Sequence, residues 1–430
     1  MKVLVVGGGG REHAIVRALK KSKDVHEIWC APGNGGISYD CNIKDISSTD
    51  VEGIVNFAKE NKFDFCIVAQ DDPLALGMVD ELEKVGIRSF GPNKTAARIE
   101  SSKVFSKNLM KKYGIPTASF EVFDDEKQAK LFIDKNENYP IVIKADGLAL
   151  GKGVLICKSK DEALCAIDSL MIDKKFGDSG NKIVVEEFLE GPEVSILTFC
   201  DGKTCKEMVS SMDHKRAYDG DEGPNTGGMG VIAPNPFYTK EIAKKCRSEI
   251  FEPTLKAMIN EGCPFKGCLY FGLMITKDGP RVIEYNARFG DPEAQAVLPL
   301  LKGDFFKICV ACNEGNLDAI DFEFEDKSSA VVIMASNGYP KSYKKGIKIE
   351  GLVNGQLENC DLKGVHIAHS GDKIENEVLK TSGGRVLGVV SIDDSLKKAL
   401  NNAYFAVEKI NFDGAFFRHD IGKRALDTIG

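Results

Sequence analysis

A short run of acidic, amide and basic side chains two residues apart carries the clearest chemical signal in the sequence. Residues 281–286 are expected to form a β-strand, so Glu284 and Asn286 lie on one face because strand side chains alternate. Carboxylate and amide oxygens are hard ligands that suit Mg²⁺ beside substrate phosphates. Arg288 continues the alternation, and a guanidinium there can neutralise a phosphoryl group during transfer. The alternative is an exposed polar strand face.

A glycine-rich segment upstream has the composition of a phosphate-binding loop between two expected strands, Ile141–Lys144 and Val154–Lys158. Its spacing excludes a Walker P-loop, because three residues separate the first two glycines and no hydroxyl residue follows the lysine. We expect a flexible hairpin loop that folds over a triphosphate, with Lys144 supplying a fixed positive charge. The loop residues concerned are Gly147, Gly151, Lys152 and Gly153.

An acidic segment after the next expected strand, Ile183–Phe188, has the character of a hinge between two domains. Its backbone can pair with an adenine edge, and Glu193 is placed to accept hydrogen bonds from ribose hydroxyls. The alternative is a set of acidic residues that are simply solvated. The hinge residues are Glu186, Glu187, Phe188 and Leu189.

Four glycines follow the first expected strand and precede a helix, where a dinucleotide-binding fold places GxGxxG. The spacing excludes that motif, because Glu12 or His13 stands where its third glycine belongs. Backbone amides at a helix N-terminus still favour an anion. We therefore expect Gly8, Gly9, Gly10 and Arg11 to hold a phosphate or carboxylate, the alternative being a tight turn without a ligand.

The elements that position these residues fall into blocks of different character. Strands and helices alternate over the first hundred residues, which predicts a doubly wound parallel sheet. Within it, Thr49 and Glu52 form a capping-box pattern, and Pro73–Lys84 is expected to be one helix. A helix over residues 101–113 leads out to a smaller strand-rich block, a larger mixed block and a third unit in the last hundred residues.

Composition narrows the class of protein further. The chain has 430 residues and a net charge of −7, so no global basic field exists for nucleic acid. No apolar run approaches the roughly 18 residues of a membrane helix. The start of the chain lacks the features of a signal peptide. Thirteen unevenly spaced cysteines without a CxxC pair are expected to be reduced thiols in a cytoplasmic protein.

Together these segments resemble the phosphoribosylamine–glycine ligase family of the ATP-grasp superfamily. The most specific stretch is DHKRAYDGDEGPNTGGMG at 213–230. The other matching stretches are GGGGREHA (7–14), APGNGG (31–36), IVIKADGLALGKGV (141–154), VVEEFLEGPEVS (184–195), IEYNARFGDPEAQ (283–295), GGRVL (383–387) and FRHDIG (417–422).

The resemblance implies a multidomain α/β and α+β fold in four parts. They are an N-terminal doubly wound α/β domain (1–100), a central ATP-grasp domain (101–120 and 193–327), an ATP-grasp lid (121–192) and a mixed α+β C-terminal domain (328–430). It also implies that ATP, glycine and 5-phosphoribosylamine give ADP, phosphate and glycinamide ribonucleotide, in the second step of de novo purine synthesis. The glycine carboxylate is activated as glycyl phosphate, so no enzyme nucleophile is required. We expect a stand-alone monomer without nucleic-acid or membrane partners.

The resemblance also assigns residues to substrates. Lys103, Lys144 and the 147–154 loop would contact ATP phosphates, the 186–189 hinge adenine, and Glu193 ribose. Glu284 and Asn286 would hold Mg²⁺ or Mn²⁺, and Arg288 would steady the transferred phosphoryl group. Arg288, Lys144, Asp213 and Lys215 are the expected catalytic residues. The residues expected around glycine and the phosphoribosyl group are Gly8, Gly9, Gly10, Arg11, Asp213, His214, Lys215, Asn225, Thr226, Gly227, Gly228, Arg288, Gly290 and Asp291.

Three positions depart from the family pattern. Asp72 stands where the family often has a longer acid, Gly8 replaces a common Asn or Ser, and residues 267–274 lack a second metal carboxylate. Two other functions stay open: another ATP-grasp ligase, for example of the carboxylase type, or a non-enzymatic nucleotide-binding regulator. The fold and ATP site would be shared with the first, so the 213–230 stretch and the N-terminal glycine loop must decide it. The intact set of Lys144, Glu284, Asn286 and Arg288 argues against the second.

Overall fold

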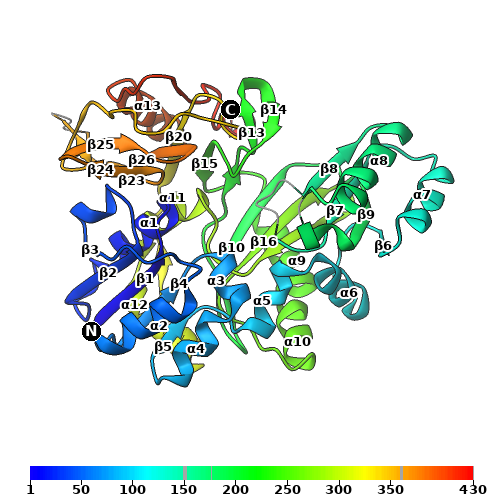
Figure 1. Cartoon of the computed structure of the whole chain (residues 1–430), viewed down its shortest axis with the longest axis horizontal. Helices are drawn as coiled ribbons and strands as arrows, with labels where there is room; N and C mark the ends of the chain where they lie inside the picture. Colours follow the sequence, from blue (N-terminus) through cyan, green and yellow to red (C-terminus); the bar gives the residue numbers. More distant parts are fainter. Residues whose placement is uncertain (149–152, 176, 359–361, 430) are drawn as a thin grey trace.

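The N-terminal region is a five-stranded parallel sheet with helices on both faces, as expected. The computed structural model describes residues 1–148, 153–175, 177–358 and 362–429 (Figure 1). Val3 and Val5 belong to one apolar cluster and Leu4 and Val6 to another, so β1 is buried on both sides. The strand order is β3 (Asn42–Ile43), β2 (Glu27–Pro32), β1 (Lys2–Gly7), β4 (Phe65–Val68) and β5 (Arg88–Phe90). The helices are α1 (Gly10–Leu19), α2 (Val51–Glu60), α3 (Asp71–Leu76), α4 (Met78–Lys84) and α5 (Lys94–Ser101).

Local details of this region differ from the sequence expectations. The N-cap of α2 is Asp50, whose carboxylate accepts from the Gly53 amide, so the capping box expected at Thr49 is wrong. The helix expected over 73–84 is two helices, because Gly77 adopts a left-handed conformation with φ of 93° between them. The helix expected over 101–113 starts only at Lys103, since Ser102 caps it by accepting from the Phe105 amide.

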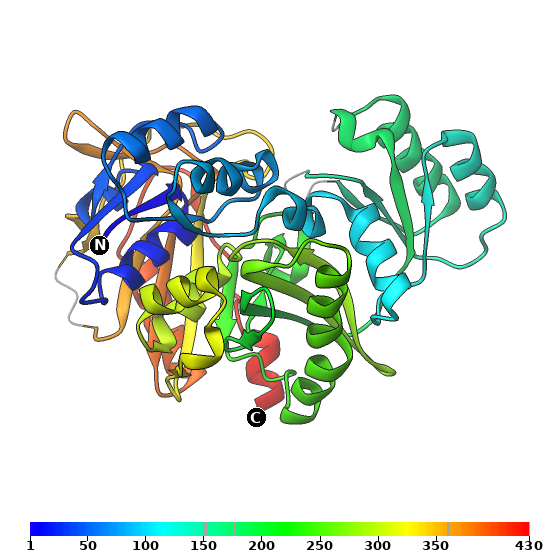
Figure 2. The same ribbon diagram turned by 90° about the horizontal axis from the view of Figure 1, so that it is seen from below.

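The lid region is a four-stranded antiparallel sheet covered by two helices, α7 (Glu126–Asp134) and α8 (Lys160–Ile167). It has its own apolar core, which includes Ala129, Ile143, Ala163 and Val185. Figure 2 shows it extending away from the rest of the molecule. The strand order is β6 (Phe120–Phe123), β9 (Ile183–Glu187), β7 (Ile141–Ala145) and β8 (Val154–Cys157).

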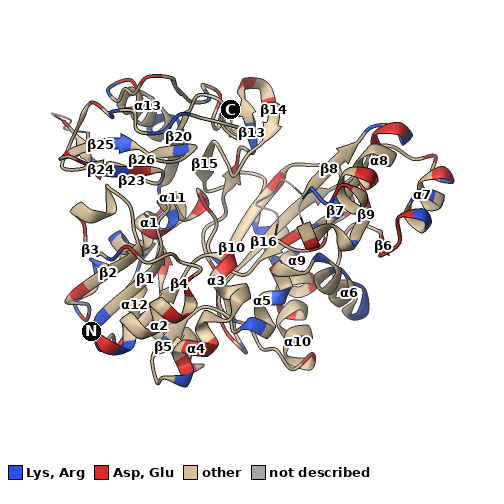
Figure 3. Cartoon of the chain, viewed as in Figure 1, with Lys and Arg blue, Asp and Glu red and all other residues tan. Residues whose placement is uncertain are grey.

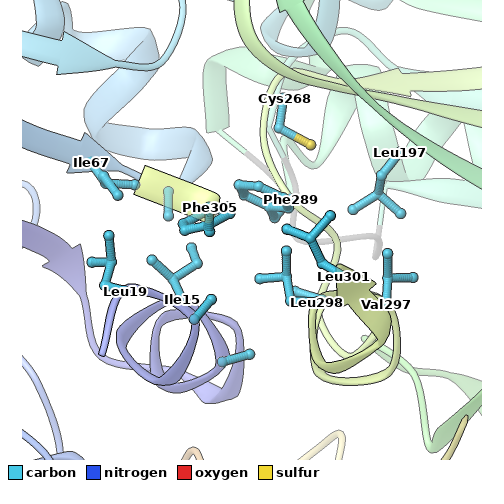
Figure 4. Packing of buried hydrophobic residues seen from close by; sticks show 14 of the residues in the cluster. Ile15, Leu19, Ile67, Leu197, Cys268, Phe289, Val297, Leu298, Leu301 and Phe305 are labelled. Atoms are coloured by element: carbon cyan, nitrogen blue, oxygen red, sulfur yellow. The ribbon is translucent and has the colours of Figure 1, made fainter. Parts of the chain in front are cut away.

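The central region is a second four-stranded antiparallel sheet whose two faces pack in different clusters. On β10, Val194 and Ile196 enter one cluster, whereas Leu197 and Phe199 enter the cluster that also holds Val3 of the N-terminal sheet. Figure 4 shows this shared core, in which Ile15 comes from the N-terminal region and Phe289 and Phe305 from the central region. The strand order is β11 (Cys205–Glu207), β10 (Glu193–Asp201), β16 (Lys266–Thr276) and β17 (Gly279–Asn286). The helices around it are α6 (Lys103–Tyr113), α9 (Lys240–Cys246), α10 (Glu252–Asn260) and α12 (Phe305–Glu314).

The C-terminal region contains a six-stranded sheet that recruits strands from far earlier in the chain. Strands β12 and β15 come from the block that the sequence assigns to the central domain, yet they pair with β20 and its neighbours. A division of the chain at 327/328 therefore cuts through one sheet. The path is β12 (Met212–Asp213), β15 (Gly230–Ala233), β20 (Ser328–Ser336), β26 (Arg385–Asp393) and β23 (Val365–His369), with β27 (Ala415–Phe416) also on β20.

Short hairpins and helices complete this half of the molecule. Helix α13 (Leu396–Val407) packs on β20 and β26, and α11 (Glu293–Val297) lies between α1 and the C-terminal sheet. The chain is described to the end of α14 (Lys423–Ile429). The hairpins are β13 (Arg216–Tyr218) with β14 (Glu222–Asn225), β18 (Leu301–Lys302) with β19 (Glu323–Phe324), β21 (Leu352–Val353) with β22 (Gln356–Leu357), and β24 (Asp372–Glu375) with β25 (Val378–Thr381).

Acidic and basic residues are interspersed over the N-terminal, lid and C-terminal regions (Figure 3). Among the described residues, every helix is too short or too polar to cross a membrane.

Candidate active site

Two buried lysines and one buried glutamate form a charged cluster where the lid meets the central region. Lys144 on β7 lies 3.0 Å from Glu186 on β9, and its ammonium also donates to the carbonyl of Ile283 at 3.1 Å. Lys107 on α6 lies 2.8 Å from the other Glu186 oxygen. The Glu186 side chain is thus occupied by lysines, which leaves only the backbone of this residue for the adenine contact that the sequence suggests. Burial lowers the pKa of Lys107 to about 8, against the raising effect of Glu186.

Lys103 connects the start of α6 to the glycine loop of the lid. Its ammonium donates to the carbonyl of Gly147 at 2.8 Å, and Asp146 accepts from the amide of Val104 at 3.1 Å. Burial lowers the pKa of Lys103, although the nearby Glu284 opposes the shift. Gly153 accepts from the amide of Ala145, whereas Gly151 and Lys152 lie outside the described residues.

The hinge begins at the last two residues of β9 and leads into β10. The Glu187 side chain is exposed and accepts from the amide of Ser119 at 2.9 Å, while Phe188 and Leu189 are half-buried. Glu193 starts β10, and its carboxylate lies 3.2 Å from the ammonium of Lys215. The roles of these residues toward adenine and ribose remain predictions.

The expected metal pair lies at the end of β17. Glu284 is partly exposed and lies 3.8 Å from Lys215, which is half-buried beside it. Burial alone would raise the pKa of Glu284, but Lys215, Lys144 and neighbouring cations lower it, so the carboxylate is held ionised. In turn Glu193, followed by Glu284, raises the pKa of Lys215 well above its usual value.

The oxygens of Glu284 and Asn286 are the hard donor type that a divalent cation needs, so the residues present fit such an ion. Across the part of the chain that the structure describes, His, Cys, Asp and Glu side chains nowhere gather in threes to form a metal centre. An ion here would therefore complete its coordination with substrate phosphates and water.

Arg288 lies just beyond the strand, which ends at Asn286, yet its guanidinium reaches back to the expected side. Its Nη2 donates to the Asn286 amide oxygen at 3.2 Å and lies 2.8 Å from Glu100 on α5. Its Nε is buried and has no partner among the described residues. Burial lowers the pKa of Arg288, but Glu100 and Asp71 outweigh it and raise the value.

Of the two neighbouring acids Asp71 and Asp72, Asp71 is the one whose charge acts on Arg288, in addition to Glu100. Asp72 is exposed, whereas Asp71 is partly buried, and burial would raise its pKa but the charges of Arg288 and Arg11 lower it. The expectation that Asp72 replaces the longer family acid is therefore not supported by its position.

A side chain of α1 occupies the anion-binding amide of the first glycine loop. Glu12 accepts from the Gly9 amide at 2.6 Å and from Arg11 Nε at 2.6 Å, so that amide is already occupied. Gly8 is required, since an added Cβ would lie 2.4 Å from the carbonyl oxygen of Gly33. Arg11 is buried and donates to the carbonyl of Phe289 at 3.1 Å, which ties the loop to the segment after β17.

Residues 213–228 fold back on themselves beside the segment that follows β17. Asp213 Oδ1 is buried without a partner in the described structure. Burial raises the pKa of Asp213 well above its usual value, and Glu293 raises it further. Thr226 closes the turn, because its hydroxyl donates to the Lys215 carbonyl and accepts from the Gly228 amide.

His214 departs from the expected substrate contact. Its Nδ1 donates to the carbonyl of Gly230 at 3.1 Å, and its Nε2 accepts from the amide of Gly422 at 3.0 Å. Burial lowers the pKa of His214 to about 4, which matches a neutral ring with both nitrogens engaged. The ring holds the C-terminal segment in place and has no free nitrogen for a substrate.

An arginine from the C-terminal region connects the 213–228 segment to the segment that follows β17. Arg385 Nη1 donates to the carbonyls of Gly227 and Asp291 at 2.5 and 2.7 Å, and its Nη2 lies 3.2 Å from the Asp291 carboxylate. Asp291 also approaches the first loop, because a Cβ on Gly9 would lie 3.1 Å from its Oδ2. Gly290 is close enough to Glu293 that an added Cβ would lie 2.3 Å from its carboxylate.

The structure thus brings most of the expected residues to one junction, and it adds three that the sequence reasoning missed. Lys107 was detectable, since it lies four residues after Lys103 on one helix face. Arg385 lies in the GGRVL stretch of the resemblance, but its partners, 94 or more residues away, were not indicated. Glu100 gave no local signal, because its partner Ala287 is 187 residues away.

Comparison with known proteins identifies the family of the chain. Residues 101–294 match the ATP-grasp (A) domain of phosphoribosylglycinamide synthetase, which defines the class as ATP-grasp. Residues 1–100 match its N domain and residues 329–424 its C domain. The chain belongs to the phosphoribosylglycinamide synthetase family.

Relatives and solved structures support the assignment. The chain is 49% identical over 421 residues to phosphoribosylamine–glycine ligase of Caldanaerobacter subterraneus subsp. tengcongensis, covering 98% of this chain and 99% of that protein. The crystal structure of phosphoribosylamine–glycine ligase from Thermotoga maritima aligns with a TM-score of 0.85 at 33% identity, covering 98% and 100%. A biotin carboxylase domain from Hydrogenobacter thermophilus aligns at 0.74 but only 17% identity, covering 97% and 91%, which shows a shared fold alone.

Proposed function

We propose that the chain joins glycine to 5-phosphoribosylamine at the expense of ATP, giving glycinamide ribonucleotide, ADP and phosphate, in the second step of de novo purine synthesis. The observation that carries this proposal is the match to one ligase family along nearly the whole chain, at 49% identity to one relative. The carboxylase alternative shares the fold only.

Activation of the glycine carboxylate is the first chemical problem. An oxide is not a viable leaving group, so a carboxylate oxygen attacks the γ-phosphorus of ATP, and ADP leaves with the electrons of the broken P–O bond. Catalysis of this step is mainly positioning and charge stabilisation. Lys144 and Lys103 would hold the ATP phosphates, and the partly exposed guanidinium of Arg288 would steady the transferred group.

A divalent cation, Mg²⁺ or Mn²⁺, would be held by the Glu284 and Asn286 oxygens and would neutralise phosphate charge when bound. Lys215 lies 3.8 Å from Glu284 and keeps this acid ionised, so the ligand is ready at neutral pH. The hinge backbone and Glu193 would hold adenine and ribose respectively.

The second step joins the two substrates. The ribosylamine nitrogen attacks the carbonyl of glycyl phosphate, the C–O bond to phosphate breaks, and the amine loses a proton. Asp213, whose buried Oδ1 lacks a partner in the described structure, would contact glycine. The glycine loop with Arg11, the 225–228 turn, Gly290 and Asp291 would surround the phosphoribosyl group. Closure of the lid over residues 121–192 would exclude water, which otherwise hydrolyses the acyl phosphate.

An assay with defined substrates tests this proposal. ADP release is measured with ATP, Mg²⁺ and ribosylamine made fresh from ribose 5-phosphate and ammonia, with and without ¹³C-glycine, and the product is identified by mass. Glycine-dependent ADP release with labelled glycinamide ribonucleotide is expected. ADP release that ignores glycine, or a product without the label, would overturn it. Light scattering on the same preparation tests the proposed monomer.

A further inference from the structure

Glu100 is a buried carboxylate from the N-terminal region that reaches into the site of the ATP-grasp region. It is the second-last residue of α5 and only 8% exposed. Its Oε2 accepts from the backbone amide of Ala287 at 2.7 Å, and its Oε1 lies 2.8 Å from Nη2 of Arg288. One carboxylate therefore holds two consecutive residues at the point where β17 ends.

This contact fixes the distance between the guanidinium of Arg288 and the side chain of Asn286. The Nη2 atom held by Glu100 also donates to the Asn286 amide oxygen at 3.2 Å, and Nη1 donates to the carbonyl of Phe289 at 3.3 Å. Two sides of the guanidinium are thereby occupied, and the buried Nε remains without a partner. The Arg288 side chain keeps 17% of its surface exposed, and this exposed part is what can meet a substrate.

Other acids compete for the same guanidinium. Asp71, Glu293 and Glu284 all act on Arg288 in addition to Glu100. A guanidinium released from Glu100 would turn toward one of them, and Glu284 is the proposed metal ligand. Correct placement therefore depends on the acid that makes the shortest contact.

We infer that Glu100 is a positioning residue for phosphoryl transfer, which aims Arg288 at the transferred group and keeps it away from the metal-binding acid. The inference rests on the role of Arg288 under the proposed function. Glutamine cannot replace Glu100, because it has one acceptor oxygen for two donors, and its NH₂ group would face an N–H. Aspartate keeps the charge but is one methylene too short to reach both partners.

A double-mutant cycle tests the inference, using Glu100→Gln, Arg288→Ala and the double variant. Glu207→Gln is the matched control, since Glu207 also pairs with an arginine, Arg247, at 2.8 Å but lies outside the site. The readouts are kcat, KM for ATP and for glycine, and the melting temperature. A misplacement of about 1 Å at a reacting centre costs about 100-fold in rate.

We expect Glu100→Gln to lower kcat about 100-fold while KM for ATP changes less than about 3-fold, and the double variant to be no slower than Arg288→Ala. The control should keep its kcat. A normal kcat for Glu100→Gln beside an inactive Arg288→Ala would overturn the inference alone, as would a double variant whose losses multiply. A fully active Arg288→Ala would overturn both the inference and the proposed role of Arg288, and a wild-type chain without product would overturn the proposed function.

A folding defect has its own control. If Glu100→Gln shows no melting transition, Glu100→Asp replaces it in the cycle, because the charge is retained. A purely structural role predicts a lowered melting temperature with unchanged kcat for that variant, which would also overturn the inference.

Discussion

Replacing Glu186 with glutamine removes the negative charge that two buried lysines share. Lys144, Lys107 and Glu186 are 5%, 2% and 4% exposed, so water cannot take over the role of the carboxylate. Breaking a buried ion pair by removing one partner costs about 3–5 kcal/mol. We expect Glu186→Gln to lower the local free energy of unfolding of the lid sheet by about this amount at pH 7.

The size of this loss depends on pH, and its sign follows from Lys107. Its folded pKa is about 8, below the ordinary lysine value, and loss of Glu186 lowers it further. Between the variant's folded pKa and pH 8, the folded variant binds fewer protons than the unfolded chain, so its stability rises by up to about 1.4 kcal/mol per pH unit. Above about pH 8 the wild-type chain gains at the same rate. The difference in free energy of unfolding between the wild type and Glu186→Gln should therefore narrow up to pH 8 and then stay constant.

Hydrogen exchange measures this directly, because the affected strands are known. Protection of the peptides over β7 and β9 is compared between wild type and variant from pH 6 to pH 9, after correction for intrinsic exchange rates. Glu121→Gln is the control, since Glu121 is exposed on β6 of the same sheet. A loss of protection below about 1 kcal/mol, or one that is equal at pH 6 and pH 8, would refute the view that these charges are shielded from water and stabilise one another.

Three further predictions concern the junction of the domains. Glu284→Ala should fold normally and lose activity even at saturating Mg²⁺. Near-normal turnover would show that Glu284 is not a metal ligand. Arg385→Ala leaves the Gly227 and Asp291 acceptors unpaired, so kcat/KM for glycine and ribosylamine should fall about 100-fold while ATP binding, measured by calorimetry, is unchanged. His214 is buried with a pKa of about 4, so the folded state binds fewer protons than the unfolded state and stability falls as the pH drops from 6.5 to 4. The melting-temperature gap between wild type and His214→Gln should therefore be smaller at pH 5 than at pH 7.5, and an equal gap would contradict the neutral-ring assignment.

The sequence predicts those features that depend on local order. The doubly wound sheet follows from strands and helices that alternate within the first hundred residues. Glu284 and Asn286 share a face because β17 alternates over 284–286, although the register of the strand shifts at Ile283 just before them. Local pattern does not reveal partners that come from a distant segment. Glu100, which holds Arg288, is the example in the site, since its charge alone resembles that of any surface glutamate.

Side-chain roles are less predictable than positions, for a physical reason. His214 lies in a stretch typical of the family, but its ring is fixed by Gly230 and Gly422, and only the fold brings Gly422 near. The Gly9 amide points to an anion, as expected of a helix N-terminus, but Glu12 of the same helix supplies that charge. In both cases an internal partner satisfies the group first.

The pairing of β15 with β20 imposes an order on co-translational folding. Gly230 pairs with Val332, so at roughly 5–20 residues per second the ribosome needs about 5–20 s to deliver that partner. The N-terminal parallel sheet is complete once Phe90 has emerged, and it can form while translation continues. During the same interval β15 presents an unpaired edge, which invites association with other chains. Nascent chains of this protein are therefore most vulnerable between the synthesis of these two strands, when a holdase chaperone gives the greatest benefit.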